Sequence, residues 1–245
     1  MQEHWERMAT ADPLWAILTD PEKTGRRWDP EEFFRSGESD VNRTMEEIAN
    51  LGVHAARGSA LDFGCGVGRL TQSLAKHFDH VDGVDISESM IALANQYNVS
   101  ERCRFTVNSA GTLAGFPANS YDFICSIIAL QHIPPRYIRN YLQEFLRMLK
   151  PNGVLAFQLP STPADPGVAG AAIRLAHHFY GKLLKRPVMY MYGIPRDQVV
   201  KYFEDRGGRV AGVLPDQSAG PQWISFRYVI VKGHETSQIC PPLLS

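Results

Sequence analysis

The sequence has no large excess of charge of either sign. Its 25 basic and 26 acidic side chains leave a formal net charge of -1 over 245 residues. Proteins that bind nucleic acid through electrostatics carry a strongly basic surface, so this balance disfavours nucleic acid as a partner. No run approaches the ~18 consecutive apolar residues of a membrane span. The amino-terminal segment lacks the basic start and apolar run of a signal peptide. We therefore expect a cytoplasmic protein without a membrane span.

Cysteine is scarce and metal-binding motifs are absent from the sequence. The four cysteines, at 65, 103, 125 and 240, are scattered, and three lie in apolar or glycine-rich segments. This distribution is typical of reduced, packed thiols rather than of a disulfide framework. Neither HExxH nor a paired CxxC motif occurs, and residues 125–134 contain no carboxylate. We therefore expect no bound metal.

Residues 58–160 alternate between short apolar runs and amphipathic stretches. The predicted strands are residues 59–64, 80–86, 102–108, 120–128 and 153–159, and the helices between them are residues 68–78, 87–97 and 135–150. This alternation builds a parallel sheet with helices on both faces. Further helices are expected at 40–52, 171–185 and 195–208. Two closing strands, 209–214 and 224–231, form a hairpin, so the last strand can enter the sheet antiparallel.

A glycine-rich turn between the first strand and the next helix is the sharpest local feature. Glycines at 64, 66 and 68 allow a tight turn and a close approach to a ligand, toward which the helix amides point. A dinucleotide fingerprint reads G-x-G-x-x-G, whereas here the third glycine comes one residue early. Asp85 ends the second strand, where a carboxylate can accept hydrogen bonds from both hydroxyls of a ribose. An NAD enzyme would use that acid too, so the glycine spacing makes the distinction.

Four segments resemble, in order, the motifs of class I S-adenosylmethionine (SAM) dependent methyltransferases of the small-molecule type. They are DFGCGVGRL, HVDGVDISESMI, SYDFICSIIALQHIP and LKPNGVLAFQLP, within residues 58–160. The resemblance implies a doubly wound α/β fold of seven strands, mostly parallel with an antiparallel last strand. It also implies an N-terminal helical lid or appendage over 1–57 and a SAM-binding domain over 58–245. A helical insertion would follow the fifth strand, at about 161–195.

The resemblance also implies which residues bind the cofactor. Asp62 would help to hold the methionine end of SAM, directly or through water, and Asp85 would take the ribose hydroxyls. After the third strand the family often has an acid, and here Ser109 is the aligned substitute. The full set implied is Asp62, Gly64, Cys65, Gly66, Asp85, Ile86, Met90, Ser109, Ala110 and Ile127.

His132, just past the fourth strand, is the candidate general base. SAM carries an activated methyl group, so the protein mainly supplies proximity and alignment, and a base is needed only where the acceptor must lose a proton. Histidine titrates near neutral pH, and the carboxyl ends of parallel strands line the ligand crevice. The alternative is that His132 hydrogen-bonds locally and fixes the loop beneath SAM.

The ends of the chain are expected to select a small-molecule acceptor. Three tryptophans and two phenylalanines before residue 35 suit a lid over an apolar acceptor, or serve only to dock the appendage. Residues 166–196 contain no acidic side chain. They contain five basic side chains: Arg174, Lys182, Lys185, Arg186 and Arg196. We hypothesise that this segment cups an acceptor bearing a carboxylate or phosphate. A lipid-interface role, a homodimer contact and a solvated basic face are the alternatives.

Three rival functions stay open from the sequence. One is an NAD(P)-dependent oxidoreductase, which the early third glycine disfavours. Another is a non-catalytic SAM-binding module, which would bind SAM without yielding S-adenosylhomocysteine (SAH). An RNA methyltransferase would need aromatic platforms in a basic groove, which only residues 166–196 offer. The sequence does not identify the methyl acceptor, nor whether its oxygen, nitrogen or carbon is methylated.

Overall fold

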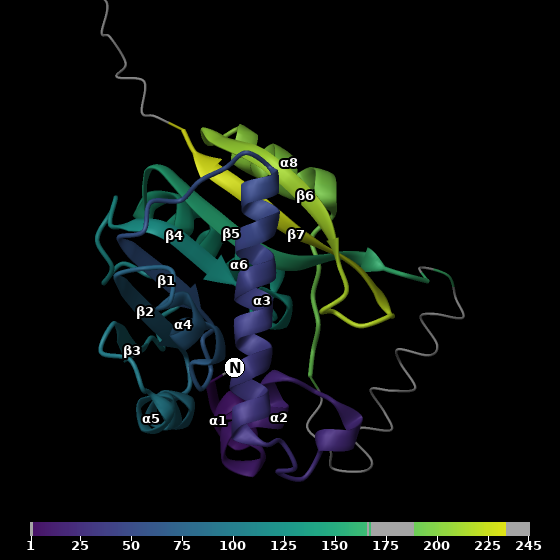
Figure 1. The fold of residues 1–245 in the computed structure, drawn as a ribbon. Coiled ribbons are helices and arrows are strands. Elements are labelled where there is room, and N and C mark those ends of the chain that lie inside the picture. Colours follow the sequence, from purple (N-terminus) through teal and green to yellow (C-terminus); the bar gives the residue numbers. More distant parts are fainter. Residues whose placement is uncertain (1, 166, 168–188, 234–245) are drawn as a thin grey trace, which may run out of the picture.

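The computed structural model describes residues 2–165, 167 and 189–233, and its centre is one seven-stranded sheet (Figure 1). The strands are β1 (Ser59–Phe63), β2 (His80–Asp85), β3 (Cys103–Val107), β4 (Tyr121–Ser126), β5 (Leu149–Pro163), β6 (Gly208–Asp216) and β7 (Trp223–Lys232). Their order is β3-β2-β1-β4-β5-β7-β6. β1 to β5 pair in parallel, while β7 runs antiparallel to both β5 and β6. The predicted fold class is confirmed.

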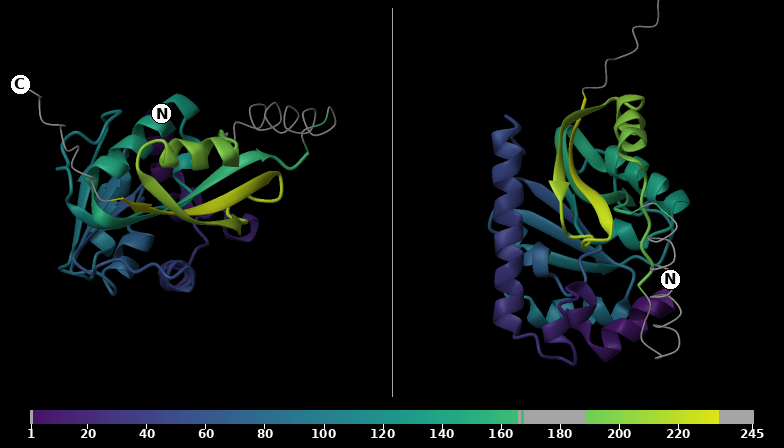
Figure 2. Two further views of the ribbon diagram at one scale, coloured as in Figure 1. Left: turned by 90° about the horizontal axis from the view of Figure 1, so that it is seen from above. Right: turned by 90° about the vertical axis from the view of Figure 1, so that its right-hand side faces the viewer.

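Helices cover both faces of this sheet. They are α1 (Gln2–Ala11), α2 (Pro13–Ile17), α3 (Pro30–Asn50), α4 (Arg69–Leu74), α5 (Glu88–Tyr97), α6 (Pro135–Met148) and α8 (Arg196–Glu204), with short 3-10 turns at Pro21–Lys23 and Leu130–His132. Figure 2 shows α3 on one side of the sheet and α6 and α8 on the other. The predicted helix at 171–185 lies outside the described residues.

Alternation along each strand creates two apolar cores. In β1, Ala60 faces the core beneath α3 and α4, while its neighbour Leu61 faces the core beneath α6 and α8. In β4, Phe123 and Ile124 divide in the same way. All four side chains are fully buried. Successive residues of a strand point to opposite faces, so a central parallel strand must be apolar on both. This is why these strands read as continuous apolar runs.

The helix α3 begins at Pro30, well before the predicted residue 40. Asp29 precedes it, and its side chain accepts a hydrogen bond of 2.9 Å from the Glu32 amide, which satisfies one of the free donors of the first turn. Proline at the first helical position has the backbone angle that a helix needs. The aspartate–proline pair is therefore the start signal for α3, and it lies upstream of the apolar pattern.

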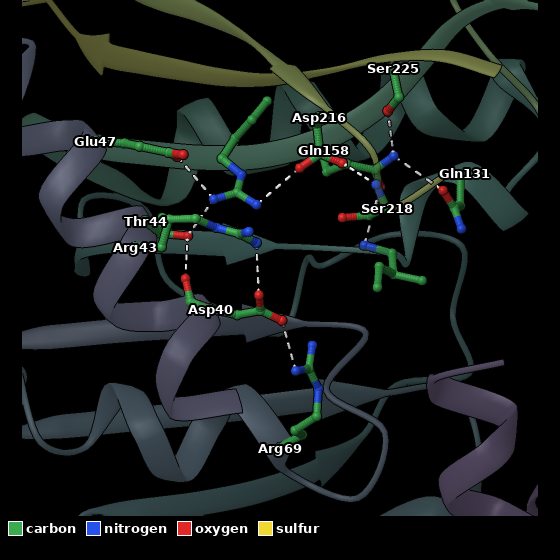
Figure 3. A network of polar contacts seen from close by, with 12 residues as sticks. Asp40, Arg43, Thr44, Glu47, Arg69, Gln131, Gln158, Asp216, Ser218 and Ser225 are labelled. Carbon is green, nitrogen blue, oxygen red and sulfur yellow. Dashed lines mark hydrogen bonds and ion pairs between the residues drawn. The ribbon is translucent and has the colours of Figure 1, made fainter. Parts of the chain in front are cut away.

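Two buried arginines donate hydrogen bonds to side chains of α3 and so connect this helix to α4 and to the sheet (Figure 3). Arg227 on β7 is 2% exposed and donates to Glu47 and Thr44 of α3 and to Asp216 of β6, each at 2.9 Å. Arg69 of α4 donates to Asp40 of α3 at 2.8 Å. A buried guanidinium must have such partners, because an unpaired buried charge is strongly destabilising.

The N-terminal helices α1 and α2 pack as a third apolar cluster against the glycine turn and α5. Phe33, Val67 and Met90 lie buried in this cluster, and Trp5, Trp15 and Trp28 pack against it. None of the helices in the described part of the chain is long and apolar enough to cross a membrane.

Candidate functional site

The glycine turn after β1 has the backbone that its sequence predicts. Gly64, Gly66 and Gly68 have φ values of +77°, +53° and +86°, a region that favours glycine. A Cβ on Gly64 would lie 2.3 Å from the Cβ of Ala129, and one on Gly68 would lie 2.8 Å from the Phe105 ring. The turn therefore needs glycine both for its angles and for its close packing against Ala129 and against the Phe105 ring of β3.

A cavity opens above this turn, between it and the segment from α1 to α2. Of the ten residues expected to bind cofactor, six line the cavity: Gly64, Gly66, Asp85, Ile86, Met90 and Ile127. Trp5 and Ile17 close it from the side of the N-terminal helices. The Gly66 position would bring a Cβ within 2.5 Å of Ile17, so the backbone here also forms part of the cavity wall.

Asp85 places a carboxylate in the wall of this cavity. One oxygen accepts from the Gly66 amide and the other from the Ser87 amide, both at 2.9 Å. Burial raises the pKa of Asp85 even though these amide hydrogen bonds favour its charged form. Each carboxylate oxygen can accept more than one hydrogen bond. Asp85 therefore retains acceptor capacity toward the cavity, which suits a pair of vicinal hydroxyls.

Asp62 and Cys65 lie behind the turn, in the protein interior. Asp62 is 1% exposed and accepts a hydrogen bond of 2.7 Å from the Thr71 hydroxyl on α4. Burial raises the pKa of Asp62 to about 6, against a lowering by the Thr71 hydrogen bond. Burial also raises the pKa of the Cys65 thiol well above its ordinary value, so the thiol stays protonated. Neither side chain lines the cavity, although the Cys65 backbone belongs to the turn.

Ser109, Ala110 and His132 line a second, open groove beside the cavity. The two hollows share Trp5, Ile86, Ile133 and Tyr141 as lining residues. Of the expected site residues, Asp62 and Cys65 line neither space, and the others are divided between the cavity and the adjoining groove.

The orientation of His132 follows from fixed donors and acceptors. Its Nδ1 lies 2.9 Å from the Tyr190 carbonyl oxygen, which can only accept, so Nδ1 carries a proton. Its Nε2 lies 3.2 Å from the Nε2 of Gln131. Burial lowers the pKa of His132, and nearby His4 adds to this. The edge of the ring packs against Trp5, with centroids 5.3 Å apart.

The Gln131 amide is itself oriented by the buried Gln158 of β5 (Figure 3). The Ile128 backbone amide donates to Gln158 Oε1 at 3.2 Å. Gln158 Nε2 then donates to Gln131 Oε1 at 3.1 Å, and to the Ser225 hydroxyl at 2.7 Å. Gln131 is left with its NH₂ group facing His132. These donors and acceptors together assign His132 as a neutral ring: Nδ1 carries the proton, and the Nε2 lone pair accepts from the Gln131 NH₂ group.

Ile128 is a site residue that the sequence did not reveal. It lines the cavity with a φ of +63°, an angle rare for any β-branched residue. Such angles persist only where surrounding contacts hold them, and they gather at functional sites. Here the hydrogen bond to Gln158 provides one of these contacts. No local sequence signal marks the position, because the constraint comes from a strand thirty residues away. Ala129, Asn108 and Tyr141 are further cavity residues outside the predicted set.

Comparisons with known proteins agree with this geometry. Residues 60–153 match a family model described as a methyltransferase domain. A trans-aconitate 2-methyltransferase from Enterobacter sp. (strain 638) is 29% identical over 69% of this chain and 59% of its own length. A 2-methyl-6-phytyl-1,4-hydroquinone methyltransferase from Synechocystis sp. is 30% identical over 50% of this chain. The chain spans only 38% of the length of that second relative.

Solved structures show the same architecture along nearly the whole chain. The magnesium protoporphyrin IX methyltransferase of Synechocystis PCC 6803, determined with bound SAH, aligns with a TM-score of 0.63. The match covers 95% of this chain and 98% of that one at 16% identity, so the likeness concerns the fold. A Leishmania major SAM-dependent methyltransferase aligns with a TM-score of 0.65 at 17% identity. Residues 60–153 therefore match a methyltransferase domain, and the fold of the chain is the one found in these solved SAM-dependent methyltransferases.

Proposed function

We propose that this protein transfers a methyl group from SAM to a small-molecule acceptor, without a metal. The observation that carries the proposal is the cavity in which Asp85 presents its carboxylate beside the bare backbone of Gly64 and Gly66. SAM needs both features. Its ribose hydroxyls need a hydrogen-bond acceptor, and its methionine end needs a backbone turn that can lie close to it. When bound, SAM supplies an activated methyl group, and the protein provides orientation and a dry site.

Different residues of the cavity would bind different parts of the cofactor. We propose that Asp85 binds the ribose hydroxyls and that Ile86 and Met90 pack beside the adenine. The backbone of Gly64, Cys65 and Gly66 would lie along the methionine end. Asp62 would favour the ammonium group of that end from behind the turn, through water, while Ile127 forms an apolar wall. Ser109 and Ala110 line the adjoining groove, so their contact with the adenine would come at its edge.

His132 fits loop fixing better than general base catalysis. A base must have a free lone pair within reach of the proton that it removes. Here Nδ1 is protonated toward the Tyr190 carbonyl, and Gln131 donates to Nε2. We therefore propose that His132 holds residues 190–192 against the end of β4. Its action as a base stays a prediction that requires Gln131 to release Nε2.

The acceptor side involves the N-terminal helices. Trp5 of α1 borders both the cavity and the groove, which favours the proposal that residues 1–57 act as a lid over a domain spanning 58–245. The basic segment lies largely outside the described residues. Of its five cations only Arg196 is described, and it bonds to Asp197 at 3.1 Å rather than facing the groove. A homodimer contact through this segment stays a proposal.

Transfer of a labelled methyl group tests the function. The protein is incubated with SAM carrying a ¹³C-methyl group and with fractionated small-molecule extract, and both SAH and labelled products are followed by mass spectrometry. Stoichiometric SAH and one labelled small molecule are expected. Tight SAM binding with no SAH under any fraction would indicate the non-catalytic binding module. Oxidation or reduction of a nicotinamide cofactor would indicate the oxidoreductase.

A further inference from the structure

The groove beside the cofactor cavity is lined by aromatic rings and by two arginines. Its rings include Trp5, Tyr137 and Tyr192, and its cations are Arg7 of α1 and Arg136 of α6. No aspartate or glutamate belongs to its described lining. The described lining of the groove therefore has two positively charged side chains and no carboxylate, although the whole chain has a net charge of -1.

Both arginines have donors left for a ligand. Arg136 stacks over the Tyr137 ring, 4.6 Å from its centroid, and donates one bond of 3.1 Å to the Tyr137 hydroxyl. A guanidinium has five N–H donors, so most of the Arg136 donors remain available. Arg7 is exposed and forms no ion pair among the described residues, although Glu3, Glu6 and Glu88 border the surface hollow on its other side. Arg7 also contributes to lowering the pKa of neighbouring His4, after burial, which agrees with a positive local field.

The aromatic side chains suit a flat molecule. Tyr141, whose hydroxyl donates to the Ala110 carbonyl at 3.3 Å, presents its ring between the groove and the cavity. Trp5 is fixed on the other side by its edge contact with His132. Rings held in this way stack on planar groups and offer little to a compact polar one. Arginine forks match planar carboxylates in the same manner.

The groove is also placed where an acceptor must be. It meets the cofactor cavity along Trp5, Ile86, Ile133 and Tyr141, which line both spaces. A molecule in the groove therefore lies next to the cavity in which we place SAM. Its anionic end would face Arg7 and Arg136, while its other end would approach the shared wall.

We propose that this groove is the acceptor site and that it selects planar small molecules bearing a carboxylate, through Arg7 and Arg136. This inference rests on the proposed function, because it names the acceptor class of that methyltransferase. It assigns specificity to described residues of α1 and α6, rather than to the basic segment after β5.

Matched acids and amides test the proposal on the full chain loaded with SAH. The probes are 4-hydroxybenzoate and fumarate, compared with 4-hydroxybenzamide and fumaramide, and binding is followed by calorimetry and by Trp5 fluorescence with a Trp5→Phe reference. We expect at least one acid to bind about tenfold or more tightly than its amide. Arg7→Gln and Arg136→Gln should each remove most of that preference, because a charge-assisted partner is lost. Arg139→Gln is the control, since Arg139 is exposed on the same helix and bonds to Gln198 outside the groove.

The outcomes separate this inference from the proposed function. If SAH binds but no acid is preferred over its amide, or if neither probe of any pair binds, the groove is not a carboxylate site. The same conclusion follows if Arg7→Gln and Arg136→Gln behave like Arg139→Gln. A wild-type chain that fails to bind SAH would instead contradict the proposed function. SAH affinity should stay within twofold of wild type in all three arginine variants.

Discussion

At the scale of single residues, Asp85 carries the cofactor proposal. Asp85→Asn should lower the affinity for SAH by about 10- to 100-fold, because hydrogen bonds to a charged group contribute about 1.5–3 kcal/mol each. Asp82→Asn is the matched control on the same strand: its carboxylate accepts from the Tyr121 hydroxyl at 2.7 Å, and it lies outside the cavity lining. Calorimetry on the three proteins checks this. Equal losses in both variants would mean that the effect is structural.

Asp62 gives the site an expected pH dependence. Its pKa in the folded chain is raised to about 6 by burial, so the carboxyl is neutral below that pH and charged above it. An ammonium-bearing ligand favours the charged form. SAH affinity should therefore fall as the pH is lowered through about 6, and Asp62→Asn should bind weakly with little dependence between pH 5 and 8. A wild-type affinity that stays flat over this range would remove Asp62 from the cofactor proposal.

His132 distinguishes alignment from base catalysis. If it fixes the loop, His132→Ala should reduce the rate of SAH formation by a similar factor at every pH from 5 to 8, a range that extends below the ordinary histidine pKa, and Gln131→Leu should do likewise. A base would instead give a wild-type rate that rises with pH through the pKa of His132, with the rise missing in His132→Ala. The pH profile of kcat distinguishes the two roles. Because burial lowers the pKa of His132, the rise that a base would give is expected below the ordinary histidine pKa.

Residues whose role depends on their neighbours in the sequence could be predicted. Residues whose conformation or protonation depends on contacts with distant parts of the chain could not. The glycines and Asp85 follow from the end of one strand and the start of the next helix, so their place in the cavity wall was predictable. The protonation of His132 depends on Tyr190, 58 residues later. The strained Ile128 depends on Gln158 in the same way. No periodicity reports such contacts.

At the scale of elements, the Glu6 side chain joins α1 to the start of α5, in addition to the apolar contacts that α1 makes. The Glu6 carboxylate accepts from the Glu88 and Ser89 amides at the start of α5. Partial burial opposes its charge, but these hydrogen bonds and those from serine hydroxyls hold the pKa of Glu6 below its usual value. A carboxylate at a helix N-terminus is favoured there by the helix dipole. This contribution is present above the ordinary glutamate pKa and is lost as the pH falls through the lowered one.

Glu6→Ala should loosen α1 without unfolding the domain. We expect limited proteolysis within α1 to become about 3- to 10-fold faster, with the unfolding midpoint nearly unchanged, because free ends open independently of the core. Glu3→Ala is the control, since Glu3 is exposed on the same helix. Equal proteolysis rates in both variants would show that Glu6 does not anchor the helix.

Elements were predicted best where periodicity alone decides. All seven strands were expected within a few residues. The central strands β1 and β4 are buried on both faces and read as apolar runs, whereas the edge strand β3 alternates between half-buried and exposed residues. The start of α3 was placed too late, since its first turns are polar and only Asp29 and Pro30 mark them. How α1 and α2 pack on the glycine turn was not predictable, because several aromatic side chains could have served equally well.

At the scale of the whole molecule, Arg227 joins the first long helix to the last two strands. Arg227→Ala should lower the free energy of unfolding by about 3–5 kcal/mol, because it leaves Glu47 and Asp216 unpaired in a largely buried environment. Arg35→Ala, which breaks an exposed ion pair with Glu31, should change it by less than about 1 kcal/mol. Urea unfolding followed by circular dichroism compares the two. Similar values would mean that the network adds little to stability.

The central claim is that the cavity above the glycine turn binds SAM, and titration of the wild-type chain with SAH at pH 7.5 tests it most directly. One SAH should bind per chain with a Kd in the micromolar range or below, NAD should not compete, and Asp85→Asn should weaken binding while Asp82→Asn does not. No heat of SAH binding, or displacement of SAH by NAD, would contradict the account.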